Sequence, residues 1–388
     1  MKYQISKKEL IINQLKSYSE KSFKLLRNKT VYDLQDSKLY IYKKIKKENP
    51  NINLSMTKFY NLCPKNFQYS KKKTDMCDIC INGKKLLKKK GNDKECKKIE
   101  YFKNHLKLNK EQKKNFKANL MNLNEKECLL IMDFKENFKI GGGPIETSQI
   151  FYNKSQVSCL GFCLIYKEGK EIKRKYINYL SKIITHDSYF VIKCLESFKL
   201  KYLKNYEKIY FWSDNAGHFR SFELMNYILL ELPNNNLTTS MNFFVEYHGK
   251  SDIDGHFGHL QKAFKIYERI GDILSLEDLL RCFKQYFSKV DTDVAFEIYK
   301  DPGRKSMMKK LTVNQPKVYL SFMTKSGKIL GSSMSTFQYN KYKNVDYKVI
   351  EKKETRKSKY APEIKSRKEW ALSFSKMRVM GSRVALLT

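Results

Sequence analysis

Apolar runs and chain breakers follow one another regularly through the middle of the sequence. The run CLLIMDF, which contains Asp133, is followed by three glycines and then by two stretches rich in β-branched and aromatic residues, 156–166 and 175–185. Short apolar runs of this composition, bounded by glycine, are typical of buried strands. The pattern therefore predicts three consecutive strands, most simply an antiparallel meander.

Helical spacing then alternates with further strands. Residues 186–204 place apolar side chains three or four positions apart, and 209–213 is a short buried-type strand that leads into Asp214. The next segments predict a helix over 221–232 closed by Pro233, a strand over 241–247, and a long helix over 254–270 stopped by Gly271. The predicted order is β-β-β-α-β-α-β-α. We therefore expect an α/β fold in which a mixed sheet carries flanking helices.

Two shorter helices are predicted upstream of this core, over 37–47 and 55–62, with Asp36 and Ser55 as N-caps. They fit either the recognition region of a helix-turn-helix or a generic helical hairpin. In the first case, Lys58 and Lys65 would touch DNA phosphates or base edges.

The downstream part of the chain predicts a helix over 275–290 and then a small β-module with strands over 317–322, 329–332 and 347–350. A basic tail over 352–383 follows, which either clamps DNA or is disordered. We expect four regions along the chain: 1–62, 63–125, 126–290 and 291–388.

Three carboxylates stand at matching ends of the core elements. Asp133 lies on the first strand, Asp214 follows the fourth, and Asp254 lies in the first turn of the helix after the fifth. Carboxylates delivered in this way can hold two divalent metal ions against a phosphodiester. The sequence therefore predicts a metal-dependent phosphate-cutting site.

Each acid also has a plainer interpretation, because an Asp after a strand is usually a turn or cap residue. Three acids at matching ends are much less often all caps. For the third acid, Glu246 and Asp252 remain alternatives to Asp254, since a change of register by one residue turns a side chain through a large angle. Either Ser251 or Asp252 would then be the helix N-cap.

Four of the six histidines fall in the same segments, at His218, His248, His256 and His259. A His-rich zinc site is one interpretation. A histidine beside a two-metal site more often orients water, contacts phosphate or packs. We expect His248 and Lys250 to contact the scissile phosphate, and His259 to be structural.

The segments SDNAGHFRS and EYHGKSDIDGHFGH, the element order and the spacing of the acids resemble the ribonuclease H-like core of DDE/DDD transposases and integrases over residues 127–271. More specifically, they are similar to eukaryotic and viral transposase-like proteins with an S-D-x-x-x-x-F element and an H-G-K-x-x-x-D-G-x-x-G element. The resemblance implies that Asp133, Asp214 and Asp254 bind Mg²⁺, which Mn²⁺ should replace. It also implies in-line cutting and joining of double-stranded DNA by a homo-oligomer.

Two other classes remain open on the same residues. One is a domesticated transposase-derived protein that binds DNA without catalysis. The other is a structure-specific nuclease or resolvase, which would cut without strand transfer, and resemblance of fold does not separate these functions.

The pair Cys77 and Cys80 has the C-x-x-C spacing with which two thiolates grip one zinc ion. Candidate partners are His105, Cys96 and Cys63, in that order, and the fourth ligand stays open. In the related transposase-like proteins a helical histidine follows the C-x-x-C by some two dozen residues, and His105 resembles it. The alternatives are a zinc-free helical segment with incidental cysteines and a redox C-x-x-C, which lacks its usual βαβ context here.

Charge changes the picture only in part. The chain carries 77 Lys and Arg against 40 Asp and Glu, a formal net charge of +37, which favours phosphate backbones as partners. A richness in Lys, Asn, Ile and Tyr is also expected from an AT-rich genome, whatever the function. With no apolar run of membrane-spanning length and no signal-peptide pattern, we expect a soluble intracellular protein in the nucleus or a viral factory.

Overall fold

The computed structural model of this chain describes residues 6–26, 29–69, 76–87, 93–234, 236–300, 305–313, 318–325, 327–335, 341–355 and 359–360. The chain divides into two compact units, Met1–Met76 and Cys77–Thr388. Most of the predicted basic tail, from residue 361 onward, lies outside the described residues.

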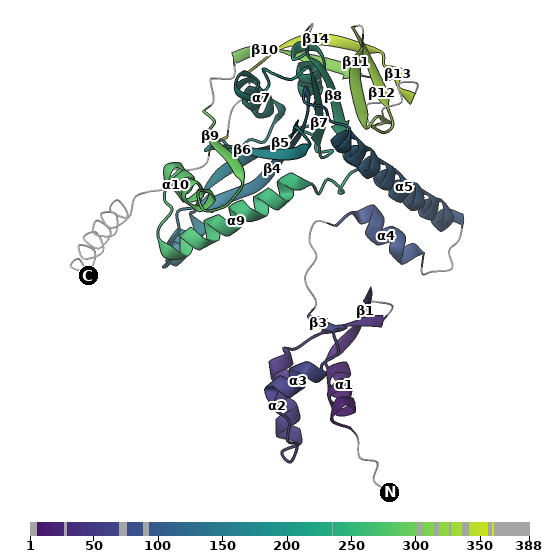
Figure 1. The fold of residues 1–388 in the computed structure, drawn as a ribbon, viewed down its shortest axis with the longest axis vertical. Helices are drawn as coiled ribbons and strands as arrows, with labels where there is room; N and C mark the ends of the chain where they lie inside the picture. Colours follow the sequence, from purple (N-terminus) through teal and green to yellow (C-terminus); the bar gives the residue numbers. More distant parts are fainter. Residues whose placement is uncertain are drawn as a thin grey trace, which may run out of the picture. The chain divides into compact units, whose positions relative to one another are not determined.

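The first unit combines three helices with a small sheet (Figure 1). Its elements are α1 (Lys7–Ser17), β1 (Ser19–Leu26), β2 (Lys29–Leu34), α2 (Lys38–Glu48), α3 (Met56–Leu62) and β3 (Phe67–Tyr69). Both predicted helices are confirmed to within one residue, although Ser37 rather than Asp36 caps the first of them. The strands were not predicted: β2 pairs antiparallel with β1 and parallel with β3, so this unit is not purely helical.

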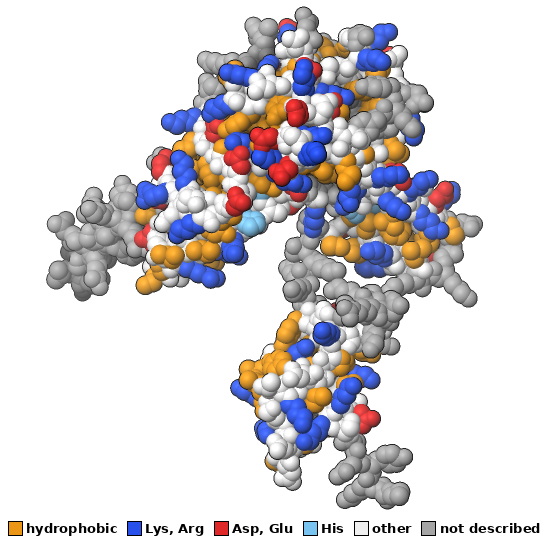
Figure 2. Space-filling model, in the orientation of Figure 1, with side chains coloured by type: hydrophobic (Ala, Val, Ile, Leu, Met, Phe, Trp, Pro, Cys, Tyr) orange, Lys and Arg blue, Asp and Glu red, His pale blue; other side chains and the backbone are white. Residues whose placement is uncertain are grey.

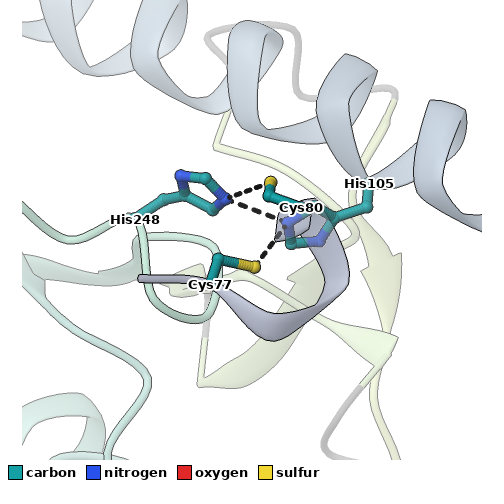
Figure 3. Close-up of side chains that lie close together, drawn as sticks. All are labelled: Cys77, Cys80, His105 and His248. Carbon is teal, nitrogen blue, oxygen red and sulfur yellow. Dashed lines mark hydrogen bonds between the residues drawn. The ribbon is translucent and has the colours of Figure 1, made fainter. Parts of the chain in front are cut away.

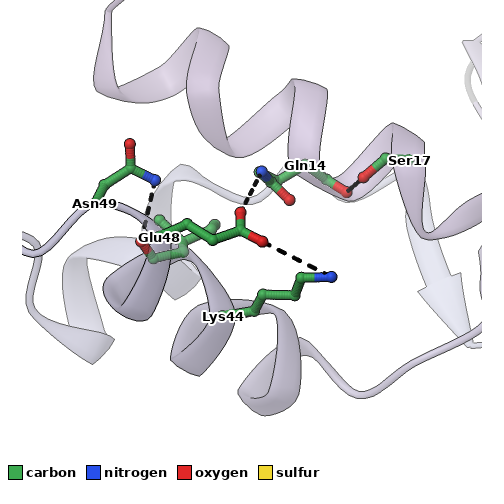
Figure 4. A network of polar contacts seen from close by, with 6 residues as sticks. Gln14, Ser17, Lys44, Glu48 and Asn49 are labelled. Atoms are coloured by element: carbon green, nitrogen blue, oxygen red, sulfur yellow. Dashed lines mark hydrogen bonds and ion pairs between the residues drawn. The ribbon is translucent and has the colours of Figure 1, made fainter.

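A polar network joins α1 to α2 at the edge of this unit (Figure 4). The Glu48 carboxylate accepts a hydrogen bond from Gln14 Nε2 at 3.0 Å and lies 3.7 Å from Lys44 Nζ. Beneath it, buried aliphatic side chains of both helices pack around Phe59 of α3: Ile11, Leu15, Ile41 and Ile45. Apolar burial therefore holds the three helices together, and the exposed polar contacts add little.

The second unit is built on a nine-stranded mixed sheet. It begins with two helices that pack on one another, α4 (Asp78–Leu86) and α5 (Asp93–Met121). The elements that follow are β4 (Glu127–Ile140), α6 (Ser148–Tyr152), β5 (Ser155–Glu168), β6 (Glu171–Ser181), α7 (Ser188–Tyr202), β7 (Lys208–Ser213), α8 (Phe222–Asn226), the π-helical turn η1 (Tyr227–Glu231), β8 (Thr238–Phe243), α9 (Asp252–Ile270), α10 (Leu276–Phe287) and β9 (Asp293–Ile298). The predicted order of strands and helices in the core is found, except that the short helix α6, which was not predicted, lies between β4 and β5.

Strand pairing in the centre of the sheet follows the expected meander. β4, β5 and β6 are antiparallel neighbours, while β7 pairs parallel with the other side of β4 and β8 pairs parallel with β7. β9 returns to pair parallel with β6 at one edge of the sheet. β4, β7 and β8 therefore run in the same direction, and the carboxyl ends of β7 and β8 lie beside each other, next to Met132 of β4.

The C-terminal strands correct the prediction of a separate β-module. The last strands are β10 (Lys305–Val313), β11 (Ser321–Lys325), β12 (Lys328–Ser332), β13 (Lys343–Asn344) and β14 (Tyr347–Thr355). β11 pairs antiparallel with β8, and β12 and β13 extend the main sheet beyond it, whereas β10 and β14 form a two-stranded sheet of their own. The physical reason is that β8 would otherwise present an unpaired edge.

Apolar cores lie on both faces of the sheet, because side chains alternate along each strand. In β4, Leu130 and Met132 face the core formed with α7, α8 and β10, whereas Leu129 and Ile131 face the core formed with α9 and α10. Figure 1 shows α7 on one side of the sheet and α9 and α10 on the other. Within the described part of the chain, no helix has the length and apolar character needed to cross a bilayer.

Candidate metal centre and carboxylate site

Four side chains from three places in the sequence meet in one buried cluster. Cys77 and Cys80 come from the start of α4, His105 from α5, and His248 from the turn after β8 (Figure 3). Their ligand atoms all lie within 4.8 Å of one another. Among the described residues, this is the one group of three or more His, Cys, Asp and Glu side chains that meets this limit.

Local structure explains how the two cysteines reach the cluster. Cys77 is the N-cap of α4 and Cys80 lies in its first turn, so the C-x-x-C spacing turns both thiols to one side of the helix start. The positive end of a helix dipole favours thiolates there. α4 can approach α5 closely because Gly83 has no side chain: a Cβ at this position would stand 2.1 Å from Cγ of the buried Phe102 ring.

The distances between the ligand atoms suit an ion with tetrahedral coordination. Cys77 Sγ lies 3.3 Å from His105 Nε2, Cys80 Sγ lies 3.3 Å from His248 Nε2, and the two Nε2 atoms are 3.0 Å apart. Zinc bond lengths of about 2.0 Å to nitrogen and 2.3 Å to sulfur give N–N and N–S edges of about 3.3–3.5 Å in a tetrahedron, a few tenths of an ångström longer. The cluster can therefore hold a metal such as zinc with little movement.

Burial favours the neutral forms of Cys80, His105 and His248. Burial raises the pKa of Cys80, and the nearby Cys77 raises it further. Burial also lowers the pKa of His105 and of His248. Neutral imidazole is the form that binds a metal, whereas a thiol must lose its proton to bind.

The second nitrogen of the His248 ring has its own partner. Nδ1 lies 3.3 Å from the side-chain amide of Asn109, one turn of α5 beyond His105. A histidine that binds metal through Nε2 carries its proton on Nδ1 and donates it to an acceptor. A half-turn of the Asn109 amide places its oxygen there, so this residue can orient the His248 ring.

These positions correct two predictions. Cys96 is exposed and lies outside the cluster, and Cys63 is buried in the first unit among apolar side chains, so neither is the fourth ligand. His248 takes that place. Both of its ring nitrogens face protein groups, while the predicted contact of His248 and Lys250 with a phosphate stays a prediction.

The three aspartates are arranged differently. Asp133 and Asp254 both line a cleft of about 940 Å³ between β4, α6 and α9. Asp214 does not line it, but stands beside Asp133, because Met132 of β4 pairs with Ser213 of β7 and each aspartate is the next residue. The strand alternation turns Asp133 toward the face covered by α9, as it does Leu129 and Ile131.

Two of these carboxylates also have local structural roles. Asp214 Oδ1 accepts a hydrogen bond from the Ala216 amide at 3.0 Å, as expected of a turn residue. Asp254 is exposed, and its Oδ2 accepts one from the Ser251 amide at 2.7 Å, at the start of α9. Ser251 is thus the N-cap, as one of the two alternatives predicted.

The alternative third acids lie elsewhere. Asp252 Oδ2 is 3.2 Å from Nε of Arg174 on β6 and lines a separate pocket with His256 and His259. Glu246 is exposed in the turn before His248, where its charge raises the pKa of Arg220 against the effect of burial. Of the three candidates, Asp254 alone shares a cleft with Asp133.

Two of the remaining histidines pack against aromatic rings. His256 is buried, stacks on Tyr176 and has its Nε2 3.1 Å from Asn178 Oδ1, and burial lowers its pKa to about 3. Burial likewise lowers the pKa of His218 to about 4, next to Phe134. His259 is exposed on α9.

Basic side chains accompany the cleft and the first unit. Lys135, Lys139, Lys154 and Lys265 line the cleft, together with the acids Glu136 and Glu268. In the first unit the side chains of Lys58 and Lys65 are exposed, but no structural feature tests their predicted contact with DNA. Figure 2 shows Lys and Arg side chains dispersed over the drawn face of each unit, between acidic and apolar side chains.

Residues 112–318 match a family profile described as Domain of unknown function (DUF8701), which spans more than half of the chain. The chain belongs to the DUF8701 family. The DUF8701 region contains the three aspartates and His248, whereas Cys77, Cys80 and His105 precede it. Comparison with proteins of curated function gives no match.

Among solved structures, the one titled "Crystal structure of NurA bound to dAMP and manganese" has a TM-score of 0.12 and 12% sequence identity to this DUF8701 protein. The similarity covers 63% of this chain and 56% of that one, a little over half its length. A likeness at this level carries no argument about the fold or the function.

Proposed function

We propose that this protein is a DNA transposase- or integrase-like enzyme that cuts and joins DNA strands with two divalent metal ions. One observation carries the proposal. Asp133 and Asp214 follow paired residues of the adjacent parallel strands β4 and β7, and Asp254 enters from α9 into the cleft that Asp133 lines. Neighbouring strands lie about 4.8 Å apart, so two carboxylates are delivered side by side and the third faces one of them.

The strand order supports this proposal. From β6 through β5, β4 and β7 to β8, an antiparallel meander is followed by two strands parallel to its first member. This is the order that a ribonuclease H-like core requires, with the first acid on the central strand. Fold resemblance alone does not determine function, so the argument rests on the acids.

The donor set of the site fits Mg²⁺ or Mn²⁺, because carboxylate oxygen is the ligand these ions prefer. Asp133, Asp214 and Asp254 would hold the ions, and each carboxylate has two oxygens with which to do so. When bound, the metals would activate the attacking water or DNA 3′-hydroxyl and stabilise the leaving oxygen. The buried Lys135, also in the cleft, would place a positive charge near the phosphate, and burial lowers the pKa of its ammonium group.

Zinc in the Cys77–Cys80–His105–His248 cluster would be structural in this enzyme. All four ligand positions come from protein side chains, which is typical of structural zinc, whereas catalytic zinc keeps a position for water. The partner we propose is double-stranded DNA, bound by a protein with a net charge of +37 that acts as a homo-oligomer.

The test compares wild type with Asp133→Asn, Asp214→Asn and Asp254→Asn for cutting and joining of labelled DNA in Mg²⁺ or Mn²⁺. The matched control is Asp252→Asn, two residues from Asp254 but turned to Arg174. We expect each of the three to fall below about 1% of wild-type activity, because charge stabilisation at the reacting phosphate is lost, with DNA binding kept and the control active.

Other outcomes of this experiment would point to one of the two alternative functions. DNA binding without cutting in either metal, in wild type as in the variants, would contradict the proposal and leave a DNA-binding protein. Cutting without joining would leave a nuclease or resolvase on the same core. Loss with Glu246→Gln in place of Asp254→Asn would move the third acid to the turn after β8.

A further inference from the structure

The segment between β8 and α9, residues 244–251, touches both sites. Its His248 belongs to the Cys/His cluster. The next residue, Gly249, lies against Asp214, and the amide of Ser251 holds the Asp254 carboxylate at 2.7 Å. Three nearly consecutive residues therefore link the metal cluster to two of the three acids.

Gly249 packs closely against Asp214. A Cβ built there would stand 3.1 Å from Cβ and 3.5 Å from Cα of Asp214. These atoms belong to the backbone and the first carbon of the side chain, which cannot swing away. The position of this segment and the position of Asp214 are therefore coupled by direct packing.

The turn that delivers His248 has an unfavourable backbone conformation. The His248 amide donates to the Val245 carbonyl at 2.9 Å, which closes a four-residue turn, and Tyr247 at its third position has φ +60°. Tyr247 is the one non-glycine residue with positive φ in the described part of the chain. Such a conformation costs about 1–2 kcal/mol in a residue with a side chain, so other contacts must hold the turn.

α5 supplies those contacts along a single face. His105, Asn109 and Gln112 are three and four residues apart, which places them on one side of the helix. Gln112 Nε2 donates to the carbonyl of Phe243, the last residue of β8, at 2.9 Å, while Asn109 and His105 contact the His248 ring. The helix thus holds the segment at its start directly and at its middle through the cluster.

We propose that zinc bound by Cys77, Cys80, His105 and His248 positions the carboxylate site. It does so because it fixes the segment 244–251, which packs on Asp214 and donates a hydrogen bond to Asp254. The inference rests on the proposed function for the role of the acids, but the mechanical coupling it describes does not. Without zinc, the His248 ring loses its anchor and the strained turn relaxes. Asp214 and Asp254 then lose the packing and the hydrogen bond that orient them.

The experiment uses the full chain as wild type, Cys80→Ser and His248→Asn, with Cys96→Ser and His259→Asn as matched controls on exposed residues outside the cluster. Elemental analysis gives zinc per chain, and hydrogen exchange reports residues 244–254, with β5 as internal reference. Paramagnetic resonance of free Mn²⁺ gives its affinity for the acids. His248→Cys restores a metal ligand and serves as the rescue variant.

We expect Cys80→Ser and His248→Asn to lose zinc, to exchange at least tenfold faster over 244–254 with β5 unchanged, and to bind Mn²⁺ about tenfold more weakly. Both controls and the rescue variant should match wild type. If a variant fails to fold, the same measurements are made on wild type stripped of zinc by a chelator and then reloaded. Loss of zinc with unchanged exchange and Mn²⁺ affinity would overturn the inference.

Failure of the proposed function gives a different result. If wild type cuts no DNA while exchange and Mn²⁺ affinity still follow zinc, the coupling stands and the enzyme proposal falls. If wild type cuts DNA and its zinc-free form cuts equally fast, the enzyme proposal stands and the positioning role of zinc falls.

Discussion

The Cys/His cluster and the three aspartates are two candidate metal sites in one unit, and they are prepared to very different degrees. The four ligands of the cluster already lie within 4.8 Å of one another and are largely buried. Asp133 lies within β4 and Asp214 directly follows β7, but Asp254 is exposed in the first turn of α9 and accepts a hydrogen bond from the amide of the N-cap Ser251. Neutral ligands can pack together without an ion, whereas carboxylates repel one another until a cation joins them.

The largest expected effect concerns the region of the three aspartates, where the stability of the folded protein depends on pH. His256 anchors α9, which carries Asp254, and burial lowers its pKa in the folded protein to about 3 from an ordinary value near 6.5. The unfolded chain therefore binds the proton more readily, and stability falls as pH drops below about 6.5. By pH 4 we expect a loss of roughly 3 kcal/mol from this group.

Denaturant unfolding at pH 7, 5.5 and 4 measures this loss. His256→Gln keeps a donor for Asn178 but does not titrate, so its stability should depend less steeply on pH than that of wild type. His259→Gln, one turn later and exposed, is the control and should follow wild type. Equal slopes for wild type and His256→Gln would show that another group governs acid unfolding.

Substitution of Gly83 disrupts the Cys/His cluster most directly. In Gly83→Ala the new Cβ would stand 2.1 Å from Cγ of Phe102. This clash forces α4 away from α5 and separates the cysteines from His105. We expect about 2 kcal/mol of destabilisation from overpacking, together with weaker binding of Co²⁺ as followed by its absorption. Gly258→Ala on α9, where a Cβ meets nothing within 4 Å, should be neutral or stabilising.

Substitution of Asn109 tests how the Cys/His cluster is oriented without removing any of its four ligands. In Asn109→Leu the Nδ1 proton of His248 loses its acceptor, so the ring is less well oriented for metal. We expect metal affinity to fall about tenfold, measured by competition with a chromophoric chelator. Asn109→Asp should restore or strengthen binding, and an unchanged affinity in the leucine variant would mean that packing alone orients the ring.

The smallest expected effect is at Tyr247, between the two sites. Glycine adopts positive φ without strain but makes the unfolded chain more flexible, so Tyr247→Gly should change the unfolding free energy by less than about 1 kcal/mol and keep zinc. In Tyr247→Val, valine does not make the unfolded chain more flexible as glycine does, but a β-branched residue is strained at positive φ. It should be the less stable of the pair by about 1 kcal/mol in thermal unfolding measured side by side.

Much of the core could be predicted from the sequence because its signals are local. The three-strand meander follows from continuous apolar runs, and the caps Ser55 and Ser251 follow from a polar side chain before a helical pattern. The placement of Asp133 and Asp214 also followed, because each comes at a fixed position in or after a recognisable strand.

What the sequence did not predict depends on contacts between distant residues. The pairing of β11 with β8 and of β9 with β6 leaves no pattern within either strand, so a separate C-terminal module was expected in place of a larger sheet. The fourth ligand is the same case: Cys96 is near the C-x-x-C in sequence, but it lies on the exposed side of α5, and His248 is 143 residues beyond His105. The incomplete ligand set and the H-G-K motif were the signals that could have joined them.

That separation of 143 residues also has a consequence for biosynthesis. Protein synthesis adds about 5–20 residues each second, so the first three ligands are synthesised at least some 7–30 s before the fourth. During this interval the nascent chain offers two thiols and an imidazole with no completing partner. If the cluster binds a metal such as zinc, the ion can be fully coordinated only after His248 is made, and until then the cysteines are open to oxidation and to competing metals.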